Sequence, residues 1–312
     1  MKSAQMKGYG SSEVIEINEN APLPNDPSVG KVLVKIEAAG VNPIDWKIRE
    51  GYMQQMIPLQ FPSPLGMDFS GTVNRVGQVV SGFREGDEVY GQASISSGGS
   101  GAFAEMAIAN AGNISTKPKS LSHQEAAGLP LVGVSAWQAL VETIGLQKGQ
   151  MILIHGGAGG IGSIAIQLAG KIGARVATTV SANDMQFAKT LGAEEVIDYK
   201  AQRFEDELHD YDAVFDTVGG DTYRRSFKIL KRGGTIVSML EQPNQKMMEE
   251  FGVKAIFQFT QVNSERLTKL AQWVDQNDVR VNVDRTFPLE EAAEALDYQK
   301  DVHPRGKVVL AI

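Results

Sequence analysis

Residues 151–169 constrain the fold of this chain more than any other stretch. Met151 to Ile154 form a short continuous apolar run, as expected of a parallel strand that is buried on both faces. Glycines follow in the spacing G-x-G-x-x-G, and from Ile161 onward apolar residues recur at helical spacing. A strand, a turn without side chains and a helix bring backbone N–H groups and the positive end of a helix dipole to a pyrophosphate. The stretch therefore predicts a dinucleotide-binding unit.

Each glycine of this turn has its own expected role. Gly157 permits a tight turn, Gly159 lets the backbone approach the pyrophosphate, and Gly162 lets the helix pack close to the strand. The alternative is an ordinary glycine-rich turn, since the chain contains 33 glycines, but the flanking strand and helix favour nucleotide binding. The residues expected to contact the cofactor here are Gly157, Ala158, Gly159, Gly160, Ile161 and Gly162.

Composition narrows the class of protein. With 312 residues the chain can form two domains with hydrophobic cores. It contains no cysteine, which excludes disulfides, a thiol nucleophile and a cysteine-bound metal. A net charge of −7 without a basic cluster argues against nucleic acid and anionic membranes as partners. No apolar run approaches the roughly 18 residues of a membrane span, and the first residues lack an apolar signal core. We therefore expect a cytoplasmic protein.

The pattern of expected elements changes along the chain. Residues 1–120 form short alternating runs between glycines and prolines, which indicates a β-rich region. After the glycine turn, buried strands alternate with helices, as is typical of a doubly wound parallel sheet. The tail contains a helix, an extended stretch at 279–283, a second helix and a final strand. Strands of the parallel sheet are expected at 151–154, 175–180, 195–199, 213–218, 235–240 and 255–260.

Several motifs outside the turn point to one family. They are G-V-N-P-I-D-W at 40–46, P-L-G-M-D-F-S-G at 64–71, G-D-E-V-Y-G at 86–91, A-A-G-L-P-L-V-G-V-S-A-W at 126–137, L-G-A-E-E-V-I-D-Y at 191–199 and G-K-V-V-L at 306–310. Together they resemble the medium-chain dehydrogenase/reductases, specifically the zinc-free quinone oxidoreductase branch with its ζ-crystallin-like proteins and alkenal or enone reductases. The resemblance covers nearly the whole chain. It implies a GroES-like β-rich domain and a Rossmann domain that binds NADPH, with the active site in the cleft between them.

The expected domains follow from the pattern and the resemblance together. The first part of the GroES-like catalytic domain is expected at 1–125 and the Rossmann domain at 126–262. Residues 263–312 are expected to complete the catalytic domain.

Zinc-dependent members of this family differ from the chain at the metal positions. They place a cysteine near Asn42, a His-Glu pair near Met67 and Asp68, and another cysteine near Gly133. Here these positions offer no thiolate or imidazole, and the four histidines are scattered without ligand spacing. We therefore expect no metal site, which disfavours alcohol oxidation by a Lewis acid.

Two residues are candidates for the chemistry. The resemblance places Asn42 near the nicotinamide and the substrate carbonyl, although an asparagine before proline can also be a turn residue that caps its own backbone. Tyr52 lies beside the position of an active-site tyrosine in relatives, where it could donate a proton or stack on the substrate. Asp45 fits a charge at a helix N-terminus better than a catalytic acid.

Further residues are expected at the cofactor. By resemblance, Val132 packs on the nicotinamide ring and the Ser135 hydroxyl lies near its amide, with helix packing as the alternative for Ser135. Lys307 reaches the cofactor side or is an ordinary surface lysine. Ser238 and Met239 lie at the carboxyl edge of the sheet, where ligands bind in such folds.

The end of the second parallel strand bears on the choice between NADPH and NADH. An acidic residue there would hold the ribose 2′-hydroxyl, whereas a small residue leaves room for a 2′-phosphate. Ser181 is small, and Tyr199 resembles the tyrosine that flanks this phosphate in relatives. Relatives tend to have a lysine or arginine near Asp184, which this chain lacks, and Asn183 or Asp184 can instead cap the next helix. The balance favours NADPH.

The resulting hypothesis is an NADPH-dependent, metal-free reductase of quinones or α,β-unsaturated carbonyls. The cofactor carries the difficult step and water can supply the final proton, so no acid–base dyad is required. The alternative is a redox-silent NADPH-binding protein that serves as a sensor or a structural, crystallin-like protein. A small-molecule substrate is the expected partner.

The stretch 255–260 also predicts a homodimer. Its sequence A-I-F-Q-F-T is apolar with high strand propensity, and an exposed sheet edge of this kind invites pairing. Relatives pair this edge across a two-fold axis. The alternative is an edge that is covered by the chain's own helices.

Overall fold

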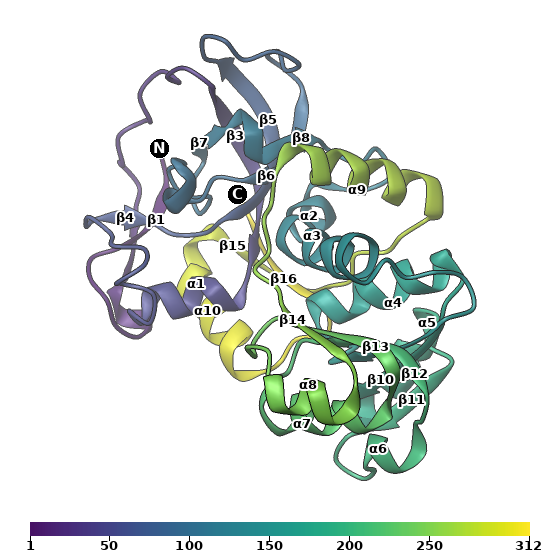
Figure 1. The fold of residues 1–312 in the computed structure, drawn as a ribbon. Helices are drawn as coiled ribbons and strands as arrows, with labels where there is room; N and C mark the ends of the chain where they lie inside the picture. Colours follow the sequence, from purple (N-terminus) through teal and green to yellow (C-terminus); the bar gives the residue numbers. More distant parts are fainter. The chain divides into compact units, whose positions relative to one another are not determined.

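The computed structural model describes residues 1–312, and the chain folds into two compact units (Figure 1). One unit comprises Met1–Leu131 and Val262–Ile312, and the other comprises Val132–Gln261. The first boundary thus lies after residue 131, where the sequence placed it after 125, and the second lies after 261 instead of 262.

The first unit is built on a seven-stranded sheet of order β15-β16-β3-β5-β6-β8, with β7 paired to β3. Its strands are β3 (Lys31–Val41), β5 (Asp68–Val76), β6 (Glu88–Gln92), β7 (Met106–Asn110), β8 (Ile114–Thr116), β15 (Val283–Pro288) and β16 (Lys307–Ala311). Val308 of β16 lies opposite Val41 of β3 in an antiparallel pair. The last strand of the chain is therefore an interior strand of this sheet, which explains why the C-terminal segment returns to the first unit.

Smaller elements complete this unit. A three-stranded sheet of order β2-β1-β4 contains β1 (Ser3–Met6), β2 (Ile15–Asn18) and β4 (Ser63–Pro64). The helices are α1 (Pro43–Arg49), α2 (His123–Ala127), α9 (Ser264–Asn277) and α10 (Ala292–Asp301), with short 3-10 turns η1 (Ser12–Val14), η2 (Ile95–Ser97), η3 (Ala111–Asn113) and η7 (Leu289–Glu291). Val32, Val34 and Ile36, which the alternating pattern places on one face of β3, are at most 1% exposed. They belong to the core of the unit.

The second unit holds a six-stranded parallel sheet of order β11-β10-β9-β12-β13-β14. Its strands are β9 (Met151–His155), β10 (Arg175–Val180), β11 (Glu195–Asp198), β12 (Tyr211–Asp216), β13 (Leu230–Ser238) and β14 (Lys254–Phe257). Its helices are α4 (Gly160–Ile172), α5 (Met185–Thr190), α6 (Phe204–Glu207), α7 (Gly220–Ser226) and α8 (Gln245–Phe251), with 3-10 turns η5 (Ala182–Asp184) and η6 (Phe227–Ile229). Counted from β9, the order is 3-2-1-4-5-6, which is that of dinucleotide-binding folds. The predicted doubly wound sheet is confirmed.

Helices cover both faces of this parallel sheet. Figure 1 shows α4 and α5 on one face and α7 and α8 on the other. Helix α3 (Pro130–Trp137) starts in the first unit and continues as a π-helical segment, η4 (Gln138–Ile144). Together with α2, these elements make residues 123–144 mostly helical, with a break before Pro130.

Some bounds differ from the expected ones. The expected strand 255–260 is the shorter β14, which forms an edge of the sheet as predicted. The strand ends at Phe257. The next residue, Gln258, still donates its backbone N–H to the Ser238 carbonyl at 2.8 Å, and its Nε2 donates to the Ser135 carbonyl of α3 at 3.0 Å. The expected extended stretch 279–283 is a connection. Strand β15 begins at its last residue, where pairing with β16 starts.

The helices are short. None is both long enough and apolar enough to cross a lipid bilayer.

Candidate active site

At several of its glycines, the turn between β9 and α4 has no room for a side chain. The positive φ that marks a tight turn is at Gly156 (+68°), one residue before the glycine to which the sequence assigned it. A Cβ at Gly157 would lie 2.0 Å from the Thr178 hydroxyl oxygen, and one at Gly162 would lie 2.2 Å from the Gly156 carbonyl oxygen. Gly157 and Gly162 therefore allow β10 and α4 to pack directly against the turn.

Gly159 stands apart from its neighbours because it has free space in front of it. A Cβ there would meet only the Gly156 carbonyl oxygen, at 3.4 Å. Gly159 is the N-cap of α4, and its carbonyl accepts the first helical bond, from Ser163 N at 2.9 Å. The N–H groups of Gly160, Ile161 and Gly162 therefore point out of the helix end without an intrahelical acceptor. This cradle fits a pyrophosphate group.

The end of β10 carries the residues expected to discriminate the two cofactors. The Ser181 hydroxyl donates to Asp184 Oδ2 at 2.6 Å. Tyr199 N donates to the Val180 carbonyl at 3.1 Å, which places the half-exposed Tyr199 beside the end of β10. Lys200 Nζ lies 5.8 Å from the centre of the Tyr199 ring. Lys200 is thus a basic side chain beside Tyr199, although the sequence offers no lysine or arginine near Asp184.

Ser238 and Met239 lie at the carboxyl edge of the sheet, as their strand position predicts. The buried Ser238 hydroxyl donates to Asp216 Oδ2 at 2.7 Å and accepts N–H groups from Leu240 and Glu241 at 3.1 and 3.0 Å. Asp216 Oδ1 in turn accepts two N–H groups of the loop after β12. This hydroxyl therefore holds the two loops that follow β12 and β13 in place.

Ser135 and Val132 lie on α3, and both are buried. The hydroxyl oxygens of Ser135 and Thr260 are 2.7 Å apart, and the Ser135 carbonyl accepts from Gln258. These bonds tie α3 to the segment after β14. Helix packing, the alternative considered for Ser135, is thus part of its role.

A buried polar cluster forms in the first unit around Asn42. Asn42 Nδ2 donates to Asp68 Oδ2 at 3.0 Å, and Asn42 Oδ1 accepts a short bond from Lys307 Nζ. Lys307 Nζ also donates to the Val41 carbonyl at 2.7 Å. Asp68 Oδ1 accepts from Gln92 Nε2 at 2.7 Å. Lys307 is therefore a buried member of this hydrogen-bonded cluster and not a surface lysine.

Asp45 joins this cluster through the backbone. Its Oδ2 accepts the Asn42 N–H at 2.7 Å, which is one half of a capping box at the start of α1. Its Oδ1 has no hydrogen-bond partner although the residue is fully buried. Asp45 thus lies at the helix N-terminus as the sequence predicted and caps it, with one oxygen left without a partner.

Burial sets the ionisation of the cluster. Burial raises the pKa of Asp45 to about 7, and the nearby Asp68 carboxylate adds to this rise. Burial also raises the pKa of Asp68 and lowers the pKa of Lys307, while the attraction between these two groups opposes both shifts. Two carboxyl groups and one ammonium group buried together carry an excess negative charge unless one carboxyl group holds a proton.

Tyr52 lies outside this cluster. It follows α1 in the turn after Arg49, its side chain is 71% exposed, and its hydroxyl makes no hydrogen bond. Its ring packs edge-on against Trp46 with the centroids 6.2 Å apart. The structure therefore brings Asn42 and Lys307 together but leaves Tyr52 apart. Gln92 was missed because only the strand register, which pairs it with Asp68, brings it here.

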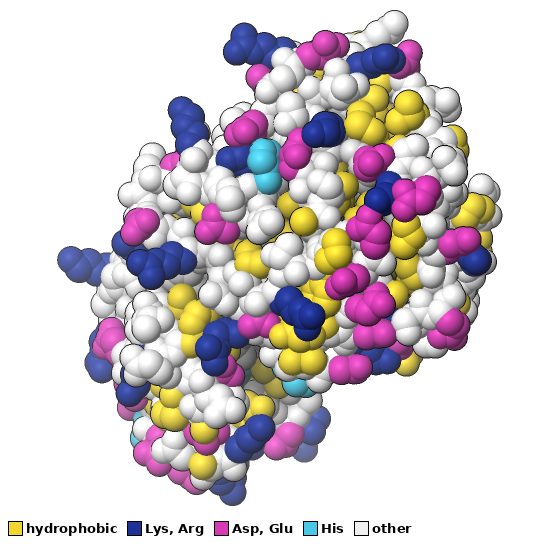
Figure 2. Space-filling view, turned by 180° about the vertical axis from the view of Figure 1, so that it is seen from behind, with side chains coloured by type: hydrophobic (Ala, Val, Ile, Leu, Met, Phe, Trp, Pro, Cys, Tyr) yellow, Lys and Arg dark blue, Asp and Glu magenta, His cyan; other side chains and the backbone are white.

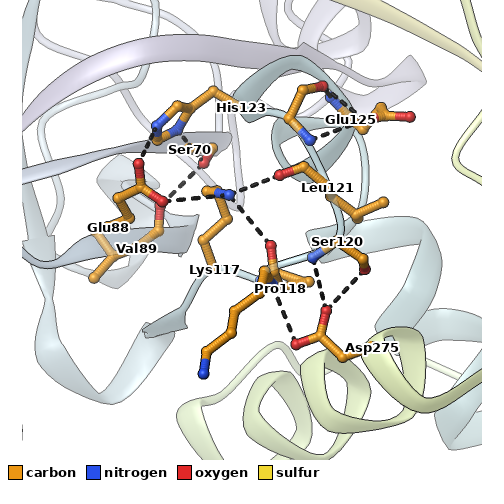
Figure 3. A network of polar contacts seen from close by, with 12 residues as sticks. Ser70, Glu88, Val89, Lys117, Pro118, Ser120, Leu121, His123, Glu125 and Asp275 are labelled. Atoms are coloured by element: carbon orange, nitrogen blue, oxygen red, sulfur yellow. Dashed lines mark hydrogen bonds and ion pairs between the residues drawn. The ribbon is translucent and has the colours of Figure 1, made fainter.

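A second polar network contains the residue types of a hydrolase triad (Figure 3). Ser70 Oγ is 2.8 Å from His123 Nδ1, and His123 Nε2 is 3.3 Å from Glu88 Oε1. However, Ser70 is fully buried and its hydroxyl lies 3.1 Å from the Val89 carbonyl, to which it donates. A serine nucleophile must give its proton to the histidine, whereas the Ser70 proton goes to the Val89 carbonyl. This network therefore links β5, β6 and α2 and is not an acyl-transfer site.

Two further findings bear on partners. No group of three or more His, Cys, Asp or Glu side chains is arranged to hold a metal ion. On the face seen in Figure 2, acidic and basic side chains are interspersed, and no basic patch of the kind that binds nucleic acid gathers there.

Comparison with known proteins supports this fold. Residues 28–119 match the alcohol dehydrogenase GroES-like domain, and residues 191–310 match the family described as zinc-binding dehydrogenase. The quinone oxidoreductase of Coxiella burnetii superimposes with a TM-score of 0.90 at 35% identity, over 100% of this chain and 99% of that one. The Escherichia coli quinone oxidoreductase in complex with NADPH gives 0.88 at 27% identity, over 100% of both chains.

Sequence relatives agree with the structures. The 2-methylene-furan-3-one reductase of Solanum lycopersicum is 35% identical over 99% of this chain and 79% of its own length. The mitochondrial NAD(P)H oxidoreductase RTN4IP1 of Danio rerio is 33% identical over 97% of this chain and 89% of its own length. The chain belongs to the medium-chain dehydrogenase/reductases, in the branch of the quinone and alkenal/one oxidoreductases. It is an oxidoreductase that uses a nicotinamide cofactor.

Proposed function

We propose that this protein is an NADPH-dependent reductase that transfers a hydride to quinones or α,β-unsaturated carbonyls without a metal ion. The observation that carries the proposal is the open cradle at Gly159, formed in a chain that is similar over its whole length to quinone and alkenal/one oxidoreductases. Quinone and enone substrates share an electron-poor carbon conjugated to a carbonyl, which accepts a hydride without a Lewis acid.

Some residues of the chain bind the cofactor, and others stabilise the charge that develops on the substrate. When bound, the reduced nicotinamide supplies the hydride. The N–H groups at the start of α4 hold the pyrophosphate. Asn42 Nδ2 gives one N–H to Asp68 and has a second one, which we assign to the oxygen that becomes negative in the transition state. Because Asp68 and Lys307 fix the amide plane, this donor needs no reorganisation during the reaction.

We propose NADPH as the preferred cofactor. Ser181 leaves room at the ribose, and the Tyr199 ring and the Lys200 ammonium group are close enough together to flank a 2′-phosphate. One relative is named an NADPH-dependent alkenal/one oxidoreductase, which supports the same choice. The cytoplasmic location expected from the sequence stays a prediction; relatives include proteins named mitochondrial and chloroplastic.

We also propose a homodimer that pairs strand β14 with its copy. The strand lies at a sheet edge, and Phe259, just beyond it, is 67% exposed. An unpaired apolar edge of this kind favours pairing. Light scattering at micromolar concentration should give twice the mass of the chain, and a monomer mass would contradict the proposal.

The central test is an NADPH-oxidation assay on a panel of quinones, enones and alkenals. A second assay measures the opposite reaction, the reduction of NADP⁺ by simple alcohols. We expect turnover of at least one class in the panel, unchanged after treatment with a chelator. NADPH binding without any turnover would support the redox-silent alternative. Alcohol oxidation that a chelator abolishes would contradict the metal-free proposal.

A further inference from the structure

Asp45, whose Oδ1 has no hydrogen-bond partner, lines a small cavity within the first unit. The cavity is lined by Asp45, Ile57, Leu59, Leu65, Ser94 and Ser96, among others. Its volume of about 20 Å³ exceeds the roughly 10–15 Å³ that one water molecule needs. The Ser94 and Ser96 hydroxyl oxygens are 2.9 Å apart, so the wall contains hydroxyl groups as well as apolar side chains. A carboxyl oxygen, two hydroxyls and a space for one water are therefore in one place.

Of the two buried carboxyl groups, Asp45 is the one suited to hold a proton. Asp68 accepts three hydrogen bonds, from Gln92, Asn42 and Leu131 N, and Lys307 is close to it. Those donors stabilise its carboxylate form. Asp45 accepts one bond at Oδ2, and its Oδ1 has none. A bare buried carboxylate oxygen is costly, whereas an O–H group at the same place can donate to a water in the cavity.

We propose that Asp45 is a neutral carboxylic acid in the folded enzyme and that, through one water in this cavity, it supplies the proton taken up by the reduced substrate. The proposal rests on the reductase function proposed above. The cavity walls Ile57 and Leu59 belong to the segment that carries Tyr52, the residue expected near the substrate. Asp45 does not touch the substrate. It holds the proton and passes it on through the water, so it is a positioning residue and not a catalytic one.

The proton balance is simple. Addition of a hydride to a quinone or enone leaves one negative charge on the substrate, as a hydroquinone anion or an enolate. The water in the cavity gives a proton to this anion and takes the proton of Asp45. The Asp45 O–H bond breaks and one O–H or C–H bond of the product forms. Solvent returns a proton to the Asp45 carboxylate before the next turnover.

Three charged or polar groups face Asp45 and determine its pH response. The Asn42 N–H favours the carboxylate, Asp68 on β5 favours the acid, and Lys307 on β16 favours the carboxylate. Burial is the largest effect and favours the acid. The pKa of about 7 in the folded state, against an ordinary value of 3.8, agrees with the unpartnered oxygen.

The first test measures protonation without any cofactor. Between about pH 4 and pH 7 the folded state holds a proton that the unfolded state has lost, so the stability contributed by Asp45 falls as the pH rises and levels off above about pH 7. Asp45→Asn keeps a capping acceptor but cannot ionise. The difference in unfolding midpoint between wild type and Asp45→Asn should therefore fall over this pH range. A flat difference would overturn the proposal.

A matched control uses the other capping box of this unit. Glu125 accepts the Ser122 N–H at 2.9 Å at the start of α2, but this hydrogen bond is exposed to solvent and Glu125 is only partly buried. Glu125→Gln makes the same change of a capping carboxyl group to an amide. It should show no such slope and no change in turnover.

The second test measures turnover. Asp45→Asn should lower kcat about 10- to 100-fold near neutral pH and remove the corresponding step from the pH profile, because solvent replaces the acid only slowly. If the enzyme reduces quinones or enones and Asp45→Asn retains the full rate and the same profile, the relay is wrong while the function stands. If neither protein turns over any substrate, the proposed function itself fails.

Ser94→Ala keeps the proposal testable if Asp45→Asn does not fold. This variant leaves the carboxyl group in place and removes one hydroxyl from the cavity wall. We expect the stability–pH curve of wild type together with a several-fold slower rate and a larger solvent isotope effect. An unchanged rate and isotope effect would contradict the relay.

Discussion

The two candidate functional regions, one in each unit, are built in opposite ways. The cofactor cradle in the second unit is made of backbone from one contiguous stretch, Gly156 to Gly162. The polar cluster in the first unit is made of side chains, and its members Asn42 and Lys307 are 265 residues apart in the chain. The cradle needs only the absence of side chains, whereas the cluster needs particular side chains, burial and a strand register at once.

This difference explains how each part could be recognised. Every residue has a backbone N–H, so a site of N–H groups is visible as a local pattern of glycines between a strand and a helix. A carboxylate or lysine gains unusual chemistry only when other elements remove water from it. We therefore expect that an added side chain in the cradle blocks cofactor binding, and that removal of a charged group from the cluster destabilises the fold.

The largest effect is expected at the cradle. Gly159→Val should abolish NADPH binding because it places a branched side chain where the pyrophosphate approaches, while the fold survives because a Cβ there meets only one atom, at 3.4 Å. Titration of NADPH and a thermal unfolding scan would check both statements. Gly170→Val, in the same helix with nothing within 4 Å of its Cβ, should bind normally. Normal binding by Gly159→Val would refute the cradle.

The next largest effect concerns charge balance in the cluster. Lys307→Met removes the only buried ammonium beside two buried carboxyl groups, and breaking a buried pair in this way costs about 3–5 kcal/mol. Urea unfolding at neutral pH measures this loss. Lys119→Met, at an exposed lysine of the same unit, should stay within about 0.5 kcal/mol of wild type. Equal stability of Lys307→Met and wild type would show that the cluster is not charged as described.

A smaller effect is expected on the chemistry. Asn42→Ala should lower kcat roughly 10²-fold because it removes the positioned amide, and loss of one such donor typically has this size. Tyr52→Phe should matter less, since its exposed hydroxyl makes no hydrogen bond. Steady-state kinetics of both variants measures which of the two side chains contributes more to kcat. If Tyr52→Phe were inactive while Asn42→Ala kept full activity, the cofactor site could stand but this account of the chemistry would be wrong.

The smallest effect concerns the choice of cofactor. Lys200→Met should raise the NADPH dissociation constant about tenfold and leave that of NADH unchanged, because a charged hydrogen bond contributes roughly 1.5 kcal/mol or more. Lys189→Met, at an exposed lysine of α5, serves as the control. Equal dissociation constants of wild type for NADPH and NADH would refute the assignment of Ser181, Tyr199 and Lys200 to the 2′-phosphate.

The sequence by itself determined the parallel sheet, the position of the glycine turn and the family, because strand, turn and helix signals act over a few neighbouring residues. It assigned the tight turn to Gly157, one residue too late. Gly156 and Gly157 are adjacent, so either could make the turn, and only the packing of Thr178 against Gly157 shows that Gly156 has the positive φ.

Tertiary structure alone decided the chemistry of the first unit. The pairing of β3 with β16 and β5 places Lys307 and Asp68 on either side of Asn42, and the segment at Ser94 lines the same cavity as Asp45. In the sequence Asp45 is only a helix cap. Its pKa rises because distant residues bury it and leave one of its oxygens without a protein partner, and burial of that kind depends on contacts that no local pattern encodes.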